Sequence, residues 1–391
     1  MSSQTPGASL SRNEASLFRK IYRHNGLARQ QLMRQQHLKS ATFYNTVDAL
    51  VQKGYVYTAP SARTGGLGRP TEALWVNPGK AYIFGAFLTV FEYRFALLDF
   101  CGGLLAQKRF EPRPGAFIDG FLRDCEASYQ ELLAAQGARD SQVCGVAVSA
   151  TGPLDAASGD MLNDQWGRFA VCAELGARLH KPVAVASNAN AIAWGLYLMD
   201  HPDGPDDLGF LLLNEGGIGV GTVLGGTLFY PARDPSPGLS HLLVGPGPMR
   251  CQCGHYGCLT TYVSPVYLCR QAAERIKLGQ PTGLRFDEPG DVTFPQLCRG
   301  AEEGDELCVQ LVRDAARAFC RGLHNYLTVL PVPLVGLGGT FVEHSPLFFD
   351  QVAQGMAGYA PALRVEKVTD YVRYAFRGIS AKLVFELLGR A

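Results

Sequence analysis

Three cysteines stand within eight positions of the chain, in the segment CQCGHYGCL, and no other feature constrains the local fold as strongly. A histidine lies upstream, so that the spacing is H-x9-C-x-C-x4-C. One imidazole and three thiolates form a donor set that suits tetrahedral Zn²⁺, and Gly254 and Gly257 permit the tight turn that brings three sulfurs together. The candidate metal ligands are His241, Cys251, Cys253 and Cys258.

Two alternatives accompany the zinc interpretation. The first is a loop of free thiols, which is disfavoured because three thiols so close together repel or oxidise without a metal. The second replaces one ligand with His255, whose side chain we expect to be exposed. Four protein ligands leave no open coordination position, so the spacing predicts a structural zinc site and not a hydrolytic one.

The composition predicts a cytoplasmic protein. The N-terminal segment MSSQTPGASLSRNEAS lacks the apolar core of a signal peptide, and no stretch of eighteen apolar residues could span a membrane. The other eight of the eleven cysteines are scattered along the chain. In a reducing compartment they are expected to be small buried hydrophobes and not a disulfide framework.

The net charge of +1 conceals a strong asymmetry. Residues 1–80 carry eleven Lys and Arg against three Asp and Glu, a net charge of +8. The rest of the chain carries 25 basic and 32 acidic residues, a net charge of −7. A basic head on an acidic body favours binding of the head to a polyanion.

The first 80 residues have the pattern of a winged helix-turn-helix. Apolar spacing predicts helices in NEASLFRKIYRHNG, ARQQLMRQQHL and KSATFYNTVDALVQKG, the last with Ser40 as its N-cap and Val47, Leu50 and Val51 on its apolar face. YVYTA and EALWV then flank a basic, glycine-rich hairpin tip. We expect the third helix to enter the major groove of double-stranded DNA and the hairpin arginines to reach the minor groove. The predicted DNA contacts are Arg29, Lys39, Ser40, Thr42, Tyr44, Asn45, Arg63 and Arg69.

From residue 81 the sequence alternates between apolar strands and amphipathic helices, which indicates α/β layers. Glycine-rich turns follow several strands, as in VCGVAVSATGPLD and LGFLLLNEGGIGVG. Two such halves that face a cleft would form an actin-like body.

The motifs VSATGPLD, SNANA, GGIGVG, SPGLSH and CQCGHYGCL, together with the head, resemble the ROK family of repressors, open reading frames and sugar kinases. The resemblance covers nearly the whole chain. It implies a DNA-binding domain at 1–80 and a two-lobed, sugar-kinase-like body at 81–391, with lobe one at about 81–186 plus 370–391 and lobe two at about 187–369. It also assigns zinc to the four candidate ligands and groups the chain with the xylose and N-acetylglucosamine regulators, which carry such a head.

The chain departs from the family's kinases at the catalytic positions. Ser187-Asn188 stands where the kinases have Asn-Asp, and an amide cannot act as the general base. Residues 87–91 replace the first phosphate loop, Asp-x-Gly-Gly-Thr, although the second glycine turn at 217–219 is kept. Gly238 and Thr260 replace two glutamates of the sugar pocket. The sequence therefore predicts a body that does not transfer phosphate.

These features predict a transcriptional repressor of carbohydrate-related genes, a homodimer or homotetramer on a two-fold operator. A sugar or another small metabolite would be its effector, with Trp166 as a ring to stack on it. The alternatives are a vestigial pocket, a sugar kinase with an added DNA-binding head, and a regulator controlled by a protein partner. The candidate effector contacts are Asn163, Asn188, Asn190, His241 and Thr260.

Overall fold

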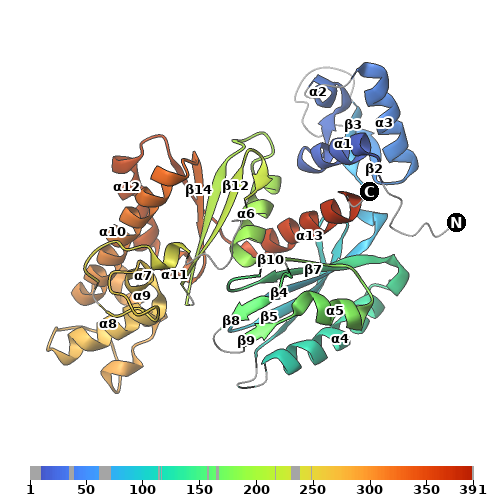
Figure 1. The fold of residues 1–391 in the computed structure, drawn as a ribbon. Coiled ribbons are helices and arrows are strands. Elements are labelled where there is room, and N and C mark those ends of the chain that lie inside the picture. Colours follow the sequence, from blue (N-terminus) through green and yellow to red (C-terminus); the bar gives the residue numbers. More distant parts are fainter. Residues whose placement is uncertain are drawn as a thin grey trace. The chain divides into compact units, whose positions relative to one another are not determined.

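The structure is a computed structural model of the chain (Figure 1). It describes residues 10–34, 39–60, 72–112, 115, 117–155, 158–163, 167–215, 217–229, 238–247 and 249–389. The chain divides into two compact units, one of residues 1–204 with 372–391 and the other of residues 205–371. The lobe boundary expected near residue 187 lies before this division, because helix α6 (Asn188–Met199) packs on strands β7 (Val143–Ala150) and β10 (Val183–Ser187) of the first unit.

The head in the first unit has three helices and a three-stranded antiparallel sheet. The helices are α1 (Arg12–Arg23), α2 (Arg29–Arg34) and α3 (Ser40–Gln52). The strands are β1 (Leu27–Ala28), β2 (Val56–Pro60) and β3 (Glu72–Val76), in the order β1-β3-β2. This arrangement is a winged helix-turn-helix, as predicted. The tip of the predicted hairpin, with Arg63 and Arg69, lies outside the described residues.

Two local expectations for the third helix are wrong. Lys39 occupies the N-cap position without a side-chain cap, and Ser40 is the first residue inside the helix. Val51 is 37% exposed, because the buried face of α3 consists of Phe43, Thr46, Val47 and Leu50. Helix α1 by contrast has a complete capping box, in which Ser11 and Glu14 satisfy each other's backbone N–H groups.

The remainder of the first unit is a five-stranded sheet of order β10-β7-β4-β5-β6. Its helices α4 and α5 cover one face, and α13 lies on the other (Figure 1). Alternation along β4 explains this, because Phe84 belongs to the core under α4 and α5 whereas Phe87 contacts Phe376 of α13. The elements are β4 (Tyr82–Leu88), β5 (Tyr93–Asp99), β6 (Leu104–Phe110), α4 (Phe117–Ala135), β7 (Val143–Ala150), β8 (Met161–Asn163), β9 (Gly167–Phe169), α5 (Val171–Leu179), β10 (Val183–Ser187) and α13 (Tyr371–Gly389).

The second unit repeats the same sheet topology, with strand order β13-β12-β11-β14-β15. In both sheets three consecutive strands are antiparallel and two later strands add in parallel on the other side of the first. This duplication is the expected actin-like body. The elements are β11 (Leu208–Asn214), β12 (Gly217–Leu224), β13 (Thr227–Leu228), α7 (Thr260–Val263), α8 (Pro265–Lys277), α9 (Phe294–Glu302), α10 (Glu306–Val329), β14 (Leu334–Gly338), α11 (Thr340–His344), α12 (Pro346–Tyr359) and β15 (Arg364–Lys367). Within the described residues, no helix is both long enough and apolar enough to cross a membrane.

Candidate functional site

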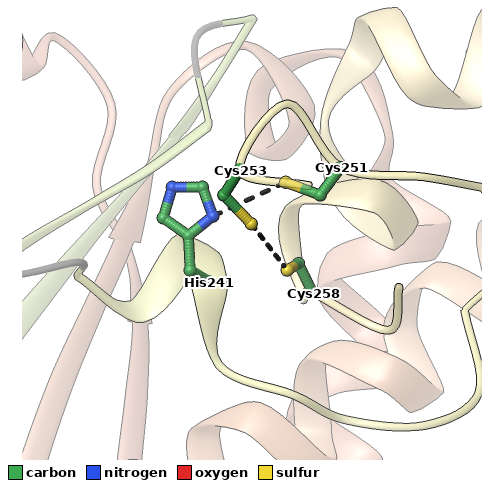
Figure 2. A group of neighbouring side chains, drawn as sticks. All are labelled: His241, Cys251, Cys253 and Cys258. Carbon is green, nitrogen blue, oxygen red and sulfur yellow. Dashed lines mark hydrogen bonds between the residues drawn. The ribbon is translucent and has the colours of Figure 1, made fainter. Parts of the chain in front are cut away.

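The four predicted metal ligands converge in the second unit (Figure 2). One ligand atom from each residue lies within 4.8 Å of the others. His241 Nδ1 is 3.5 Å from Cys251 Sγ, and Cys253 Sγ is 3.5 Å from Cys258 Sγ. Neighbouring ligand atoms of a tetrahedral site with Zn–S bonds of about 2.3 Å are separated by about 3.8 Å, so these spacings suit such an ion.

Close backbone packing forms the cysteine loop. Gly257 has φ +85°, and a Cβ there would lie 2.0 Å from the carbonyl oxygen of Gly245. Only glycine can therefore occupy this position, where the returning strand of the loop passes directly against the segment that follows His241. On the other side, the backbone N–H of Gln252 donates to the hydroxyl of Tyr267 in α8, at 3.1 Å.

The thiols differ strongly in their electrostatic surroundings. Hydrogen bonds with the backbone and the side chain of His255 lower the pKa of the exposed Cys253 thiol to about 6. Burial and hydrogen bonds with the other two thiols raise the pKa of Cys258 to about 12. Thiols that share hydrogen bonds lose their protons at different pH values, because the first thiolate disfavours deprotonation of the next thiol. A bound cation would remove that penalty, so the group could hold a metal ion.

His255 is the rival ligand considered from the sequence. Its Nδ1 atom lies 3.6 Å from Cys253 Sγ, so it contacts one thiol. The four residues that come within mutual ligand distance do not include it. Its contact with Cys253 lowers the pKa of that thiol.

The turn that carries His241, Leu239–His241, is held against the start of β12. Ser240 Oγ accepts a hydrogen bond from the backbone N–H of Ile218 at 2.8 Å. Gly217 has φ +119°, and a Cβ there would lie 2.9 Å from Ser240 Oγ and 3.3 Å from Thr260 Oγ1. The glycine turn, His241 and Thr260 are therefore parts of one packed site in the second unit.

Asn188 is buried and fully engaged in the first unit. Its Nδ2 donates to the carbonyl oxygen of Leu88 at 2.9 Å, and its Oδ1 accepts from Ser149 Oγ at 2.6 Å. The residue thus ties the start of α6 to the ends of β4 and β7. These two partners could not be predicted from local sequence patterns, because they lie 100 and 39 positions away.

The other candidate effector contacts are divided between the units. Asn190 is partly buried in the first turn of α6, where its backbone N–H donates to Ser187 Oγ at 3.3 Å. Thr260 is buried at the start of α7 in the second unit. The backbone of Asn163 ends β8. Trp166 lies outside the described residues.

The turn between β4 and β5, where the kinases have their phosphate loop, is closed by its own side chain. Thr89 Oγ1 accepts from the backbone N–H groups of Phe91 and Glu92 at 3.2 and 2.9 Å. The Phe91 side chain is 56% exposed. The backbone N–H groups of Phe91 and Glu92 are therefore already bonded within the turn.

The predicted DNA-contacting side chains of the third helix lie at the surface. Lys39, Ser40, Thr42, Tyr44 and Asn45 are all exposed. The guanidinium of Arg29, the first residue of α2, lies 5.9 Å from the centre of the Tyr44 ring, so the two helices present one continuous polar face.

The second unit also contains a cavity of about 490 Å³ that sequence reasoning missed. Its lining combines apolar side chains such as Pro265, Val266 and Phe294 with polar groups from Glu215, Thr340 and His344. These residues come from four separate segments, so no local sequence signal could have identified the cavity.

Comparison with known proteins assigns the family. Residues 92–375 match the model of the ROK family, which is more than half of the chain. The chain belongs to the ROK family. The first 91 residues, including the whole winged head, lie outside the matched region of this ROK protein.

ROK relatives with two different functions are similar to the chain. The xylose repressor of Caldicellulosiruptor bescii is 21% identical over 346 residues, which cover 88% of this chain and 86% of the repressor. A crystal structure of a ROK family transcriptional regulator, a homologue of the E. coli MLC protein, matches with a TM-score of 0.79 at 21% identity and covers 96% of both chains. A ROK glucokinase from Streptomyces griseus, in complex with glucose and AMPPNP, matches with a TM-score of 0.62 at 21% identity and covers 77% of this chain and 98% of its own. The two structures establish the shared fold.

Proposed function

We propose that this ROK protein is a DNA-binding transcriptional repressor of carbohydrate-related genes, whose body senses a sugar or another small metabolite. The observation that supports this most strongly is the union of a winged helix-turn-helix, with its polar α3 face exposed, and a ROK body in one chain. The similarity to a xylose repressor over 88% of the chain agrees with it.

DNA recognition would use the surface of α3. In a winged head the recognition helix lies in the major groove, where Tyr44 and Asn45 reach base edges while Lys39, Ser40 and Thr42 reach phosphates. Arg29 would steady Tyr44 from the neighbouring helix. The hairpin arginines Arg63 and Arg69 would read the minor groove. A homodimer or homotetramer would present such heads in pairs to a two-fold operator.

Zn²⁺ is the ion that this donor set suits best, and the four ligands would hold it as a closed structural site. Its chemistry there is to cross-link the cysteine loop to the turn of His241, because no coordination position is left for a substrate. By ordering the loop, the ion would also hold the candidate effector residues His241 and Thr260 in place, because Ser240 and Gly217 pack beside them. Asn163, Asn188 and Asn190, the candidates in the first unit, stay predictions from the sequence.

We propose further that the body does not transfer phosphate. A kinase would need a carboxylate at position 188 to deprotonate the sugar hydroxyl. This proposal is supported by the hydrogen bond that the Asn188 amide donates to the carbonyl oxygen of Leu88 at 2.9 Å. A carboxylate in that place would set two oxygens against each other. The cavity of the second unit, lined in part by Glu215 and His344, is compatible with ligand binding.

The direct test is to select DNA fragments with the purified chain from a genomic library and to measure binding by gel retardation. Lys39→Ala and Asn45→Ala should each weaken specific binding, by on the order of tenfold if Asn45 makes a bidentate base contact. Arg12→Ala is the matched control, because it removes one exposed charge from α1 without touching α3. If chains lacking residues 1–80 retard the same fragments, the head is not the DNA-binding domain.

The same fragments decide between the alternatives. When the fragments are placed upstream of a reporter gene, the chain should repress expression of that gene. One member of a panel of free sugars should relieve the repression. Release only by a cell protein would favour the partner-controlled regulator. Phosphorylation of a hexose by the purified chain would favour the kinase.

A further inference from the structure

The last turn of α1 has a second contact surface, outside the core of the head. Tyr22 is completely buried, and its ring lies 5.2 Å from that of Phe385 in α13 at an angle of 75°. The guanidinium of Arg377, two turns earlier in α13, lies 4.6 Å from the centre of the same ring. The head is therefore docked on the C-terminal helix of the chain, within one compact unit.

The next residue of α1 makes a matching contact with α6. The Arg23 guanidinium lies 4.1 Å from the centre of the Tyr197 ring, which is a close cation–π geometry. Tyr197 is stacked on Trp194 at 5.2 Å, and Trp194 in turn meets Phe385 edge-on at 6.4 Å. These residues of the head thus contact one continuous aromatic cluster, which we call the junction. The Arg19 guanidinium of α1 also lies 5.7 Å from the centre of the Phe385 ring. The junction comprises Tyr22, Arg23, Trp194, Tyr197, Arg377 and Phe385.

The two helices beneath the junction are locked together by glycines. A Cβ at Gly378 of α13 would lie 1.9 Å from the carbonyl oxygen of Ala191, and a Cβ at Gly195 of α6 would lie 2.0 Å from that of Tyr374. The backbones are therefore in direct contact at the crossing. Helices packed this closely move as one body, because any relative rotation would force backbone atoms into each other.

The other end of α6 lies at the ligand-binding edge of the sheet. The helix begins directly after β10, with Ser187 as its N-cap and with Asn188 bonded to the ends of β4 and β7. In open α/β sheets, ligands bind in the crevice at the carboxyl ends of the strands. Asn188 and Tyr197 are nine residues apart, a span of about 14 Å along one rigid helix.

We infer that α6 and α13 form a single rigid element that fixes the orientation of the head, with Tyr22 and Arg23 as positioning residues for DNA recognition. This inference rests on the proposed DNA binding. A displacement of Asn188 by a ligand is transmitted along α6 to the junction and turns α3 with the head. Two heads of a dimer then lose the spacing that a two-fold operator requires.

Hydrogen exchange of the full chain tests the docking without DNA. Arg23→Ala should accelerate exchange by about tenfold in the last turns of α13 and α6, because the cation–π contact of the partly buried Arg23 with the buried Tyr197 ring is lost. Tyr22→Phe is the control that should exchange like the wild type. It keeps the ring contacts and removes a buried hydroxyl that has no hydrogen-bond partner among the described residues. Wild-type exchange in Arg23→Ala would overturn the docking.

The DNA arm tests the role in orientation. Using a DNA fragment selected by the wild type, binding is compared between versions with one and two half-sites. Arg23→Ala should bind DNA with one half-site as tightly as the charge-matched Arg12→Ala does. The increase in affinity that the second half-site provides should, however, be at least tenfold smaller in Arg23→Ala. An unchanged gain would refute the positioning role. If the wild type selects no DNA, the proposed function itself fails, whereas the exchange result still decides the docking.

Discussion

Replacing Gly378 by alanine should destabilise the first unit, although alanine is the better helix former. The new Cβ would lie 1.9 Å from the carbonyl oxygen of Ala191 and 2.7 Å from the backbone nitrogen of Gly195. Non-bonded contacts are most favourable at about 3.5–4.0 Å, so the two helices would have to separate by about 1.5 Å. Such overpacking costs about 1–3 kcal/mol or more, and the better helix propensity of alanine offsets about 1 kcal/mol. Because both contacts are rigid backbone atoms, we expect the upper end, a net loss of about 2 kcal/mol.

Gly120 in α4 provides the matched control. A Cβ there meets nothing closer than the Tyr93 hydroxyl at 3.7 Å, so Gly120→Ala should stabilise the chain by about 0.4–1 kcal/mol. Calorimetry of the two variants should show melting temperatures displaced in opposite directions, by about 2–4 °C per kcal/mol for a unit of this size. If Gly378→Ala melts at or above the wild-type temperature, α6 and α13 are not in rigid contact and the argument from the crossing fails.

Three further outcomes are expected. Elemental analysis should find about one zinc per chain, and Cys253→Ser should lose it while Cys269→Ser, which lines the cavity of the second unit, retains it; metal-free wild type purified under reducing conditions would contradict the assignment. Burial alone would raise the pKa of Glu14, but its ion pair with Lys53 and its bonds with Ser11 lower it overall, so Glu14→Gln should cost about 1 kcal/mol of head stability at neutral pH. That difference is fully present above the unfolded pKa of about 4.3 and should disappear as the pH falls through the lower folded value, as urea unfolding at pH 7 and pH 3 would reveal. Finally, a coupled assay should detect no ATP-dependent phosphorylation of hexoses, and Asn188→Asp should destabilise the protein without creating turnover.

The winged head and the cluster of four candidate metal ligands could be predicted from the sequence, because both depend on local patterns. Apolar spacing located Leu17, Phe18 and Ile21 on the buried face of α1, where the structure has them. The cysteine spacing placed Cys251, Cys253 and Cys258 in one turn, and the structure brings His241 to them. What failed locally was fine detail at a helix end, where Lys39 and not Ser40 occupies the N-cap position.

The long-range contacts could not be predicted from the sequence. Asn188 was identified as the residue that replaces a catalytic carboxylate, yet its bonds with Leu88 and Ser149 depend on how β4, β7 and α6 meet. The docking of α1 on α13 joins Tyr22 to Phe385, from opposite ends of the chain. The apolar spacing of the sequence cannot predict such a pair, because it only identifies each residue as an apolar position on its own helix.

The sequence by itself determined the kinds of elements, their order and the donor set of the candidate metal site. These follow from spacings of a few residues, over which chain geometry is fixed by helix and turn parameters. Only the tertiary structure decided which helices cross at Gly195 and Gly378, and therefore which helices of the first unit the last turn of α1 contacts. The physical reason is that a glycine in a helix does not by itself indicate which other helix packs against it. The glycine matters because the backbone of a second helix packs directly against it. The assembled sheet, and not the residues next to the glycine in the chain, decides which helix that is.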